Sequence, residues 1–332
     1  MTLMSRIAPQ LIALAALVAL VSVFYPGFLS VDVQNDRLVG PVIDILKRSA
    51  PVALLAVGMT LVIATRGIDL SVGTIMAICG AAAAWALTAG LGAGAALAMA
   101  LGAGLVAGLW NGVLVAVVGI QPFVATLILM TMGRGVAQLI TEGRILTFTD
   151  PGFSWLGSGT ALGLPVPVWI WLATAAAAAL LMRRTALGLL VEAVGINRRA
   201  ALLAGVNATV LLITVYVASG FCAALAGIIV TADIRGADAN NAGLWLELDA
   251  ILAVVIGGNS LLGGRFSIAA SVLGALIIQT ISAGILLAGF ASEYNLIIKA
   301  GLVLVILILQ SPRIASEWWL WRDSHRAQGD RA

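Results

Sequence analysis

The feature that most constrains this sequence is a long stretch without charge. From Leu70 to Gly133 the chain runs 64 residues without a charged side chain. A charge at the centre of a bilayer costs roughly 2.5 to 3.5 kcal/mol on insertion scales, so long charge-free stretches mark lipid-buried sequence. No soluble core could bury a segment of this length. We therefore expect an integral membrane protein that crosses the bilayer several times.

The composition extends this interpretation to most of the chain. The 332 residues are 61% hydrophobic and 10% charged, whereas soluble domains carry about 25% charged residues. Segments 151–182, 200–232 and 266–292 are also free of charge, and each is long enough for a transmembrane helix. The 37 glycines allow close helix packing, and no segment alternates apolar and polar residues as a β-barrel would. The predicted fold class is an all-α polytopic membrane protein.

Ten spans fit the apolar pattern, and Arg6 places the N-terminus in the cytoplasm. This places both termini in the cytoplasm, with a transmembrane domain over 1–313 and a polar tail over 314–332. Basic residues cluster at span ends, which indicates orientation rather than nucleic-acid binding. Segment 32–48 fits this arrangement of spans least well and is expected to be an external, partly helical element. The expected spans are 9–29, 51–65, 72–89, 96–118, 122–140, 165–182, 210–231, 248–262, 267–288 and 294–310.

Two of these spans are short and broken by glycine. An offset of 191 residues superposes Gly67 on Gly258 and Gly73 on Gly264, which suggests a parallel internal repeat with interrupted helices in both halves. Asp69, three residues after Arg66, is expected to form a local ion pair or helix cap, or to belong to a gate hinge. The gate candidates are Gly67, Asp69, Gly73, Gly257, Gly258, Asn259, Gly263 and Gly264.

Polar residues inside a bundle need either a structural partner or a function. An amide beside an indole suits a sugar, whose hydroxyl groups need donors and acceptors while its ring prefers an aromatic surface. Interhelical hydrogen bonding explains Asn111 equally well, and Glu247 and Asp249 also fit acidic residues at a helix N-terminus. The candidates for a substrate pathway are Asn111, Gln121, Asn240, Asn241, Trp245, Glu247 and Asp249.

The sequence has few residues that could form a metal site, a disulfide or a nucleotide-binding loop. The single histidine, His325, lies in the predicted tail, and Cys79 and Cys222 lie within apolar stretches, so we expect neither a metal site nor a disulfide. The two lysines do not fit a phosphate-binding loop. We therefore expect a transport subunit that is not an enzyme and holds no cofactor, with any ATP hydrolysed by another chain.

The connection 183–209 mixes apolar, basic and glycine residues. It is predicted to face the cytoplasm, either presenting apolar residues to a soluble partner or lying on the membrane surface.

Three motifs together resemble those of a known family. They are G-I-D-L-S-V-G at 67–73, T-x-x-G-x-x-x-x-A-x-G-x-N-x-x-A-A-x-x-x-G-V at 185–206, and E-L-D-A-I at 247–251 followed by G-G-N-S-L-L-G-G-R at 257–265. They resemble the ribose/galactose-type sugar permeases of binding-protein-dependent ABC importers. Segments 50–60, 121–130 and 237–249 are similar to permeases of galactofuranose importers. Arg66 departs from the family, which usually has glycine there.

The resemblance implies a half-transporter that imports a monosaccharide, galactofuranose or a related aldose, across a bacterial inner membrane. It implies a second permease subunit, cytoplasmic ATPase subunits that hold Mg-ATP, and a periplasmic sugar-binding protein. It also assigns ATPase coupling to Glu192, Gly195, Asn197, Ala201 and Gly205. An ion-coupled secondary transporter is the alternative; it needs a carboxylate deep in the membrane, whereas Asp69, Glu247 and Asp249 are predicted near span ends.

Overall fold

The computed structural model describes residues 3–34, 37–290 and 294–309. By its contacts the chain divides into two compact units, Met1–Thr280 and Ile281–Ala332. The second unit contains, among the described residues, the end of one long helix and the helix that follows it. The predicted tail 314–332, with His325, lies outside the described residues.

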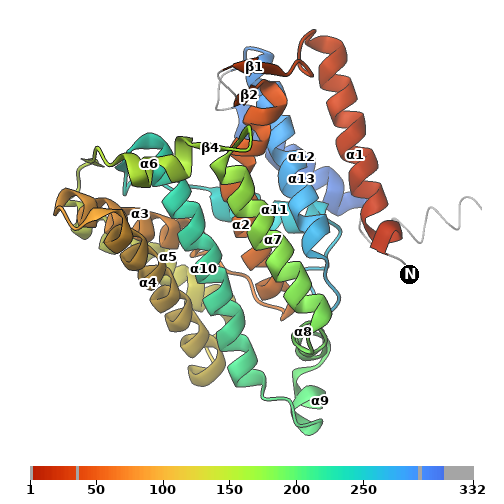
Figure 1. The fold of residues 1–332 in the computed structure, drawn as a ribbon. Helices are drawn as coiled ribbons and strands as arrows, with labels where there is room; N and C mark the ends of the chain where they lie inside the picture. Colours follow the sequence, from red (N-terminus) through yellow and green to blue (C-terminus); the bar gives the residue numbers. More distant parts are fainter. Residues whose placement is uncertain (1–2, 35–36, 291–293, 310–332) are drawn as a thin grey trace, which may run out of the picture. The chain divides into compact units, whose positions relative to one another are not determined.

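The described chain is mainly helical, as predicted (Figure 1). The long helices are α1 (Leu3–Phe24), α2 (Pro41–Ala64), α3 (Val72–Thr88), α4 (Gly92–Val113), α5 (Pro122–Thr141), α7 (Val166–Arg184), α10 (Ala208–Ile234), α12 (Ile268–Leu287) and α13 (Tyr294–Leu309). The short ones are the π-helical turn η1 (Leu114–Val118), which extends α4, and α6 (Pro151–Ser158), α8 (Leu187–Ile196), α9 (Arg198–Leu203) and α11 (Leu246–Ile256).

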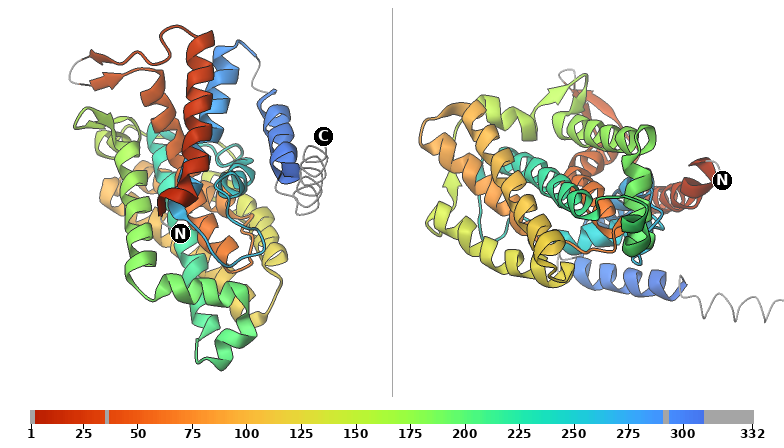
Figure 2. Two further views of the ribbon diagram at one scale, coloured as in Figure 1. Left: turned by 90° about the vertical axis from the view of Figure 1, so that its right-hand side faces the viewer. Right: turned by 90° about the horizontal axis from the view of Figure 1, so that it is seen from below.

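Helix α10 is the centre of the first unit. It packs against α2, α3, α4 and α6, and Figure 2 shows it between these helices from two further sides. Glycines permit this packing because their lack of a side chain lets backbones meet. A Cβ at Gly104 of α4 would lie 2.6 Å from the Gly220 carbonyl oxygen, and a Cβ at Gly227 of α10 would lie 2.4 Å from that of Met76 in α3.

Each of the ten expected spans coincides with a helix, but the number of crossings is not settled by length. Seven helices are long and apolar enough to span a bilayer among the described residues, and α3, with 17 residues, falls just short. Helix α11 has only 11 residues, about 16 Å of helix, and is therefore too short to cross alone. Helix α2 begins at Pro41, ten residues before the predicted start, because Pro51 is accommodated within it.

Short strands gather at one end of the unit, which we call the hairpin end. Strands β1 (Asp32–Gln34) and β2 (Arg37–Val39) form a hairpin within the segment 32–48, and β4 (Thr160–Ala161) pairs with β5 (Leu164–Pro165). Strand β3 (Leu146–Thr147) pairs with β6 (Gly236–Ala237), which joins the connections after α5 and α10. At the opposite end lie α8 and α9, and we call this the α8 end.

The two glycine-broken segments are 65–71, between α2 and α3, and 257–267, between α11 and α12. The offset of 191 residues carries Ala64, the end of α2, to position 255, one residue from the end of α11. It carries Val72, the start of α3, to position 263, although α12 begins at Ile268. Gly73 lies in the first turn of α3 while Gly264 lies in the loop, so these two positions do not correspond; a repeat in three dimensions stays a prediction.

Candidate functional site

The first broken segment is fixed by hydrogen bonds from neighbouring helices. Asp69 is buried, with 1% of its surface exposed, and its Oδ1 accepts from the backbone N–H (3.0 Å) and hydroxyl (2.6 Å) of Ser71, which caps α3. Its Oδ2 accepts from the Ser219 hydroxyl of α10 at 2.9 Å. Asp69 thus fixes the turn just before α3, whose N-cap residue is Ser71, and makes no hydrogen bond to the first turn of the helix itself. The predicted ion pair with Arg66 is wrong, because that guanidinium donates to the Ile196 carbonyl oxygen at 2.8 Å.

Two more helices hold the same segment. Asn111 of α4 donates from Nδ2 to the Ser71 hydroxyl at 2.8 Å, and Thr126 of α5 lies 3.2 Å from the Leu70 backbone N–H and 3.1 Å from the Ile68 carbonyl oxygen. Asn111 has no exposed surface and its Nδ2 is used in this interhelical hydrogen bond, so its place along a substrate pathway stays a prediction. Asp69 thus belongs to a rigid junction of four helices.

The second broken segment is held at fewer points. Asn259 donates to the Ser271 hydroxyl at 2.8 Å and accepts from the Ser267 backbone N–H at 2.7 Å, which connects the segment to the start of α12. Gln10 of α1 donates to the Gly257 carbonyl oxygen at 2.9 Å. Between these contacts, Ser260, Leu261 and Leu262 are exposed. Of the two segments, the second is the more exposed.

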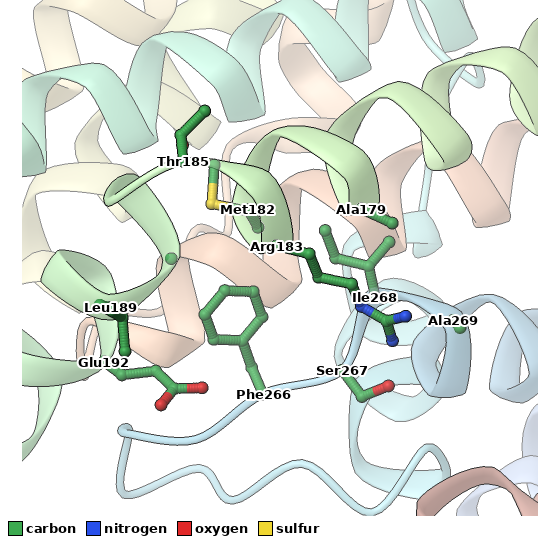
Figure 3. A pocket seen from close by; sticks show the side chains of 11 residues that line it. Ala179, Met182, Arg183, Thr185, Leu189, Glu192, Phe266, Ser267, Ile268 and Ala269 are labelled. Atoms are coloured by element: carbon green, nitrogen blue, oxygen red, sulfur yellow. The ribbon is translucent and has the colours of Figure 1, made fainter. Parts of the chain in front are cut away.

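The residues predicted for ATPase coupling lie on or beside α8 and α9 with different exposure. Gly195 and Ala201 are buried against the first unit, whereas Asn197 and Gly205 are exposed. Asn197 caps α9 by accepting from the Ala200 backbone N–H at 3.0 Å. Glu192 lines a cavity of about 310 Å³ between α7, α8 and the start of α12, where Figure 3 shows its carboxylate below the Phe266 ring. Only the exposed positions are free to meet a partner.

A polar loop, residues 238–245, connects β6 to α11 and contains three of the seven predicted pathway residues, Asn240, Asn241 and Trp245. The Asp238 carboxylate accepts from the Asn240 (3.0 Å) and Asn241 (3.2 Å) backbone N–H groups and from Nδ2 of Asn241 at 2.7 Å. This side-chain amide of Asn241 lowers the pKa of Asp238 more than its burial raises it. Asn240, Asn241 and Trp245 are exposed. The loop is therefore folded tightly around one carboxylate and presents amides and an indole outward.

Arg134 of α5 holds this loop in place. Its Nη1 donates to the Ala239 carbonyl oxygen at 2.9 Å and to that of Ala242 at 2.7 Å, and its charge is attracted by Glu247 and Asp238. Glu247 is buried in the first turn of α11, where a Cβ added at Gly73 would lie 2.5 Å from its Oε2, so it faces α3. Glu247 is therefore covered by α3 in this structure, and its place along a substrate pathway stays a prediction. Asp249, in the same turn, is half-buried.

Helix α5 has two different exposed faces. Thr131, Arg134 and Gln138 follow the spacing i, i+3, i+7 of one helical face, and Gln138 donates to Oδ1 of Asn240 at 2.7 Å. We call Thr131, Arg134 and Gln138, together with Asn240, Asn241 and Trp245, the polar strip. The adjoining face exposes only apolar side chains, namely Ile128, Met132, Val136 and Leu139. A lipid environment fits the apolar face and not the polar strip.

The structure separates Gln121 from the polar strip. Gln121 precedes the first turn of α5 and lines a cavity of about 260 Å³ with Arg66, Gly67 and Arg198 at the α8 end. Gln138 lies 17 residues further along the same helix, about 25 Å away. Any role of Gln121 therefore belongs to the opposite end of the molecule.

Sequence reasoning overlooked Arg134, Thr126 and Ser219. Arg134 carried a usable signal, because an arginine within a predicted span is costly unless it has partners. Thr126 and Ser219 carried none, since hydroxyl groups commonly bond to their own helix and only the fold directs them to segment 65–71.

The chain is similar to known permeases over most of its length. The sequence profile of the family described as "Branched-chain amino acid transport system / permease component" matches residues 42–307. The galactofuranose transporter permease protein YtfT of Escherichia coli is 62% identical over 93% of this chain and 90% of that protein. The fructose import permease protein FruF of Bifidobacterium longum is 41% identical over 94% and 89%, and the ribose import permease protein RbsC of E. coli 40% over 92% and 93%. No solved structure matches this chain.

Proposed function

Because this chain belongs to the family of branched-chain amino acid transport system / permease components, we propose that it is the permease subunit of an ATP-driven sugar importer. Its relatives are permeases named for galactofuranose, fructose and ribose, and the 62% identity to the first favours galactofuranose or a related aldose. In this role the chain moves the sugar and breaks no bond itself.

The polar strip is the observation that carries the proposal. Amide groups and an indole lie exposed beside an apolar face of the same helix, and a membrane protein exposes such groups to a water-filled route rather than to lipid. Amides donate and accept hydrogen bonds to sugar hydroxyl groups, while an indole covers the ring face. One chain supplies only one wall of this route. A second permease subunit, the same chain or a paralogue, supplies the other.

The α8 end and the hairpin end of the first unit are the expected binding surfaces for the remaining partners. Leu189 and Leu203 of α8 and α9 are 74% and 92% exposed, which suits the docking of ATPase subunits that bind Mg-ATP. A sugar-binding protein would meet the hairpin end. Arg183, Arg184, Arg198 and Arg199 lie at the α8 end and favour a cytoplasmic location for it, with both termini on that side of a bacterial inner membrane.

An ion-coupled secondary transporter is the competing function, and the burial of Asp69 is the observation in its favour. Such transporters use carboxylates inside the bundle to bind protons or sodium. Here the hydrogen bonds to Ser71 and Ser219 explain why this carboxylate is buried, so we favour the ATP-driven importer.

Uptake in proteoliposomes that contain the cognate ATPase and binding protein separates the two functions. We expect sugar uptake that requires ATP and persists with proton and sodium ionophores; uptake that ionophores abolish would establish the alternative. Within the strip, Gln138→Leu removes an amide, and the loss of one hydrogen bond to the sugar corresponds to about 3- to 10-fold weaker uptake at low substrate. Met132→Leu, on the apolar face, is the matched control and should leave uptake unchanged.

A further inference from the structure

Helix α8 ends where the two broken segments meet. The backbone N–H of Gly264 donates to the carbonyl oxygen of Ala64, the last residue of α2, at 2.9 Å. Gly195 of α8 lies against both partners, because a Cβ added there would be 1.9 Å from that oxygen and 2.8 Å from the Gly264 nitrogen. No side chain fits at this position. The end of α8 is therefore in direct backbone contact with the end of α2, where the first segment begins, and with the second segment.

The side chain of Arg66, which belongs to the first segment, contacts both α8 and the second segment. Its Nη2 donates to the carbonyl oxygen of Ile196, the last residue of α8, at 2.8 Å. The last carbonyl groups of a helix have no partner within it, so this bond completes the end of α8. The aliphatic part of Arg66 lies against the second segment, because a Cβ added at Gly263 would be 2.5 Å from the arginine Cγ.

The backbone of Arg66 is unfavourable for arginine. Its φ of 64° lies in the left-handed region, where a residue with a Cβ is strained and glycine is not penalised. The side chain is exposed, so its hydrogen bond to Ile196 adds only modestly to stability. The strain opposes this gain, so stability alone gives no reason for arginine here.

We infer that Arg66 is a positioning residue that makes α8 and both broken segments move together, so that the cytoplasmic coupling element and the substrate route change state in one step. This inference rests on the proposed function. Arg66 touches neither sugar nor ATP. It acts by holding the end of α8 against segments 65–71 and 257–267.

The variant Arg66→Gly separates coupling from stability. It removes the contacts of the Arg66 side chain with Ile196 and Gly263, which we call the tie, and it also removes the backbone strain at position 66. We expect an unchanged or higher unfolding temperature in detergent, together with about 3- to 10-fold fewer sugars moved per ATP hydrolysed, the range for one lost hydrogen bond. Arg66→Lys retains a cation and a stem, and should restore part of this ratio. A fall in the unfolding temperature with an unchanged ratio would show a merely structural role and overturn the inference.

Leu162→Gly is the matched control. Leu162 has a φ of 52° in the turn between β4 and β5, is 89% exposed, and lies at the hairpin end. Its replacement relieves the same kind of strain without touching α8. We expect a similar gain in stability and an unchanged ratio of sugar to ATP. A ratio lowered as far as in Arg66→Gly would show that relief of strain, not loss of the tie, is responsible.

A distance measurement tests the tie without transport. Spin labels at Leu189→Cys on α8 and Leu262→Cys on the second segment occupy exposed positions, while the natural Cys79 and Cys222 are buried. We expect a narrow distance distribution that broadens in Arg66→Gly and stays narrow in Leu162→Gly. An equal width in all three proteins would overturn the inference. Failure of ATP-dependent uptake in the unmodified protein would instead refute the proposed function, and the distance measurement would still decide whether Arg66 ties the elements.

Discussion

Asp69 connects three helices through one carboxylate. Its two oxygens accept from Ser71 at the start of α3 and from Ser219 of α10, and Ser71 in turn accepts from Asn111 of α4. A buried hydrogen-bonded group of this kind costs more to remove than it contributes, because its partners are left without acceptors. The main role of this carboxylate is thus to hold the start of α3 against α10.

Asp69→Ala should lower the free energy of unfolding by about 2 to 4 kcal/mol, since the two serine hydroxyl groups lose their acceptor inside the bundle. Thermal unfolding in detergent measures this. Asp150→Ala is the control, because Asp150 caps a helix, accepting from the Phe153 backbone N–H at 2.8 Å, but is only half-buried. Its loss should cost about 1 kcal/mol. Equal losses in both variants would mean that burial of Asp69 adds nothing.

The polar loop should respond to acid. The Asn241 amide holds the pKa of Asp238 below its ordinary value of 3.8, so the folded loop favours the charged carboxylate. Its contribution is present above the unfolded pKa and is lost as the pH falls through the lower folded pKa. Hydrogen exchange of residues 238–245 should therefore accelerate below about pH 4. Asp238→Asn should exchange fast at every pH, and a loop equally protected at neutral and acidic pH would contradict this.

At the scale of elements, two segments of similar sequence have different surroundings. Segment 65–71 is fixed by side chains of α4, α5 and α10, whereas segment 257–267 is held at Gly257, Asn259 and Gly264 and is exposed at 260–262. Glycine content predicted that both helices break, and both do. It could not predict which break is rigid, because Thr126, Ser219 and Asn111 come from distant parts of the sequence.

The start of α3 should tolerate no side chain at Gly73. A Cβ there would lie 2.3 Å from the Gly243 carbonyl oxygen, so Gly73→Ala should push the polar loop away and lower the unfolding temperature. Gly102→Ala in α4 is the control, because nothing lies within 4 Å of its Cβ. That change should be neutral or stabilise the helix by up to about 1 kcal/mol. If both alanines behaved alike, the close contact of α3 with the loop would be wrong.

For the whole molecule, the sequence predicted what depends on hydropathy and little of what depends on contacts between distant residues. Apolar stretches located every long helix among the described residues, and Asn240, Asn241 and Trp245 are exposed together. The early start of α2 was missed because Lys47 and Arg48 read as a polar connection, although Lys47 pairs with Asp233 of α10 at 2.6 Å. Asn111 and Glu247 were predicted along a substrate pathway and Gly195 at an ATPase contact. Each of the three is buried, because another helix or loop covers it.

The orientation of the molecule can be measured from its two ends. Cysteines at Leu203, in α9, and at Leu162, in the β4–β5 turn, would lie at opposite ends of the first unit and are both highly exposed. In intact spheroplasts, a thiol reagent that cannot cross membranes should label Leu162→Cys and spare Leu203→Cys. In inverted vesicles the pattern should reverse. Labelling of Leu203→Cys from outside the cell would place the proposed ATPase contacts on the wrong side.

Helix α1 precedes residues 42–307, which the family profile matches, yet it completes a backbone hydrogen bond within them. Its Gln10 supplies the donor for the Gly257 carbonyl oxygen, at the point where the short helix α11 stops inside the bundle. In hydrocarbon no water is available to take over that role. A protein deprived of its first helix would retain every family motif and still carry a bare carbonyl dipole partway across the bilayer.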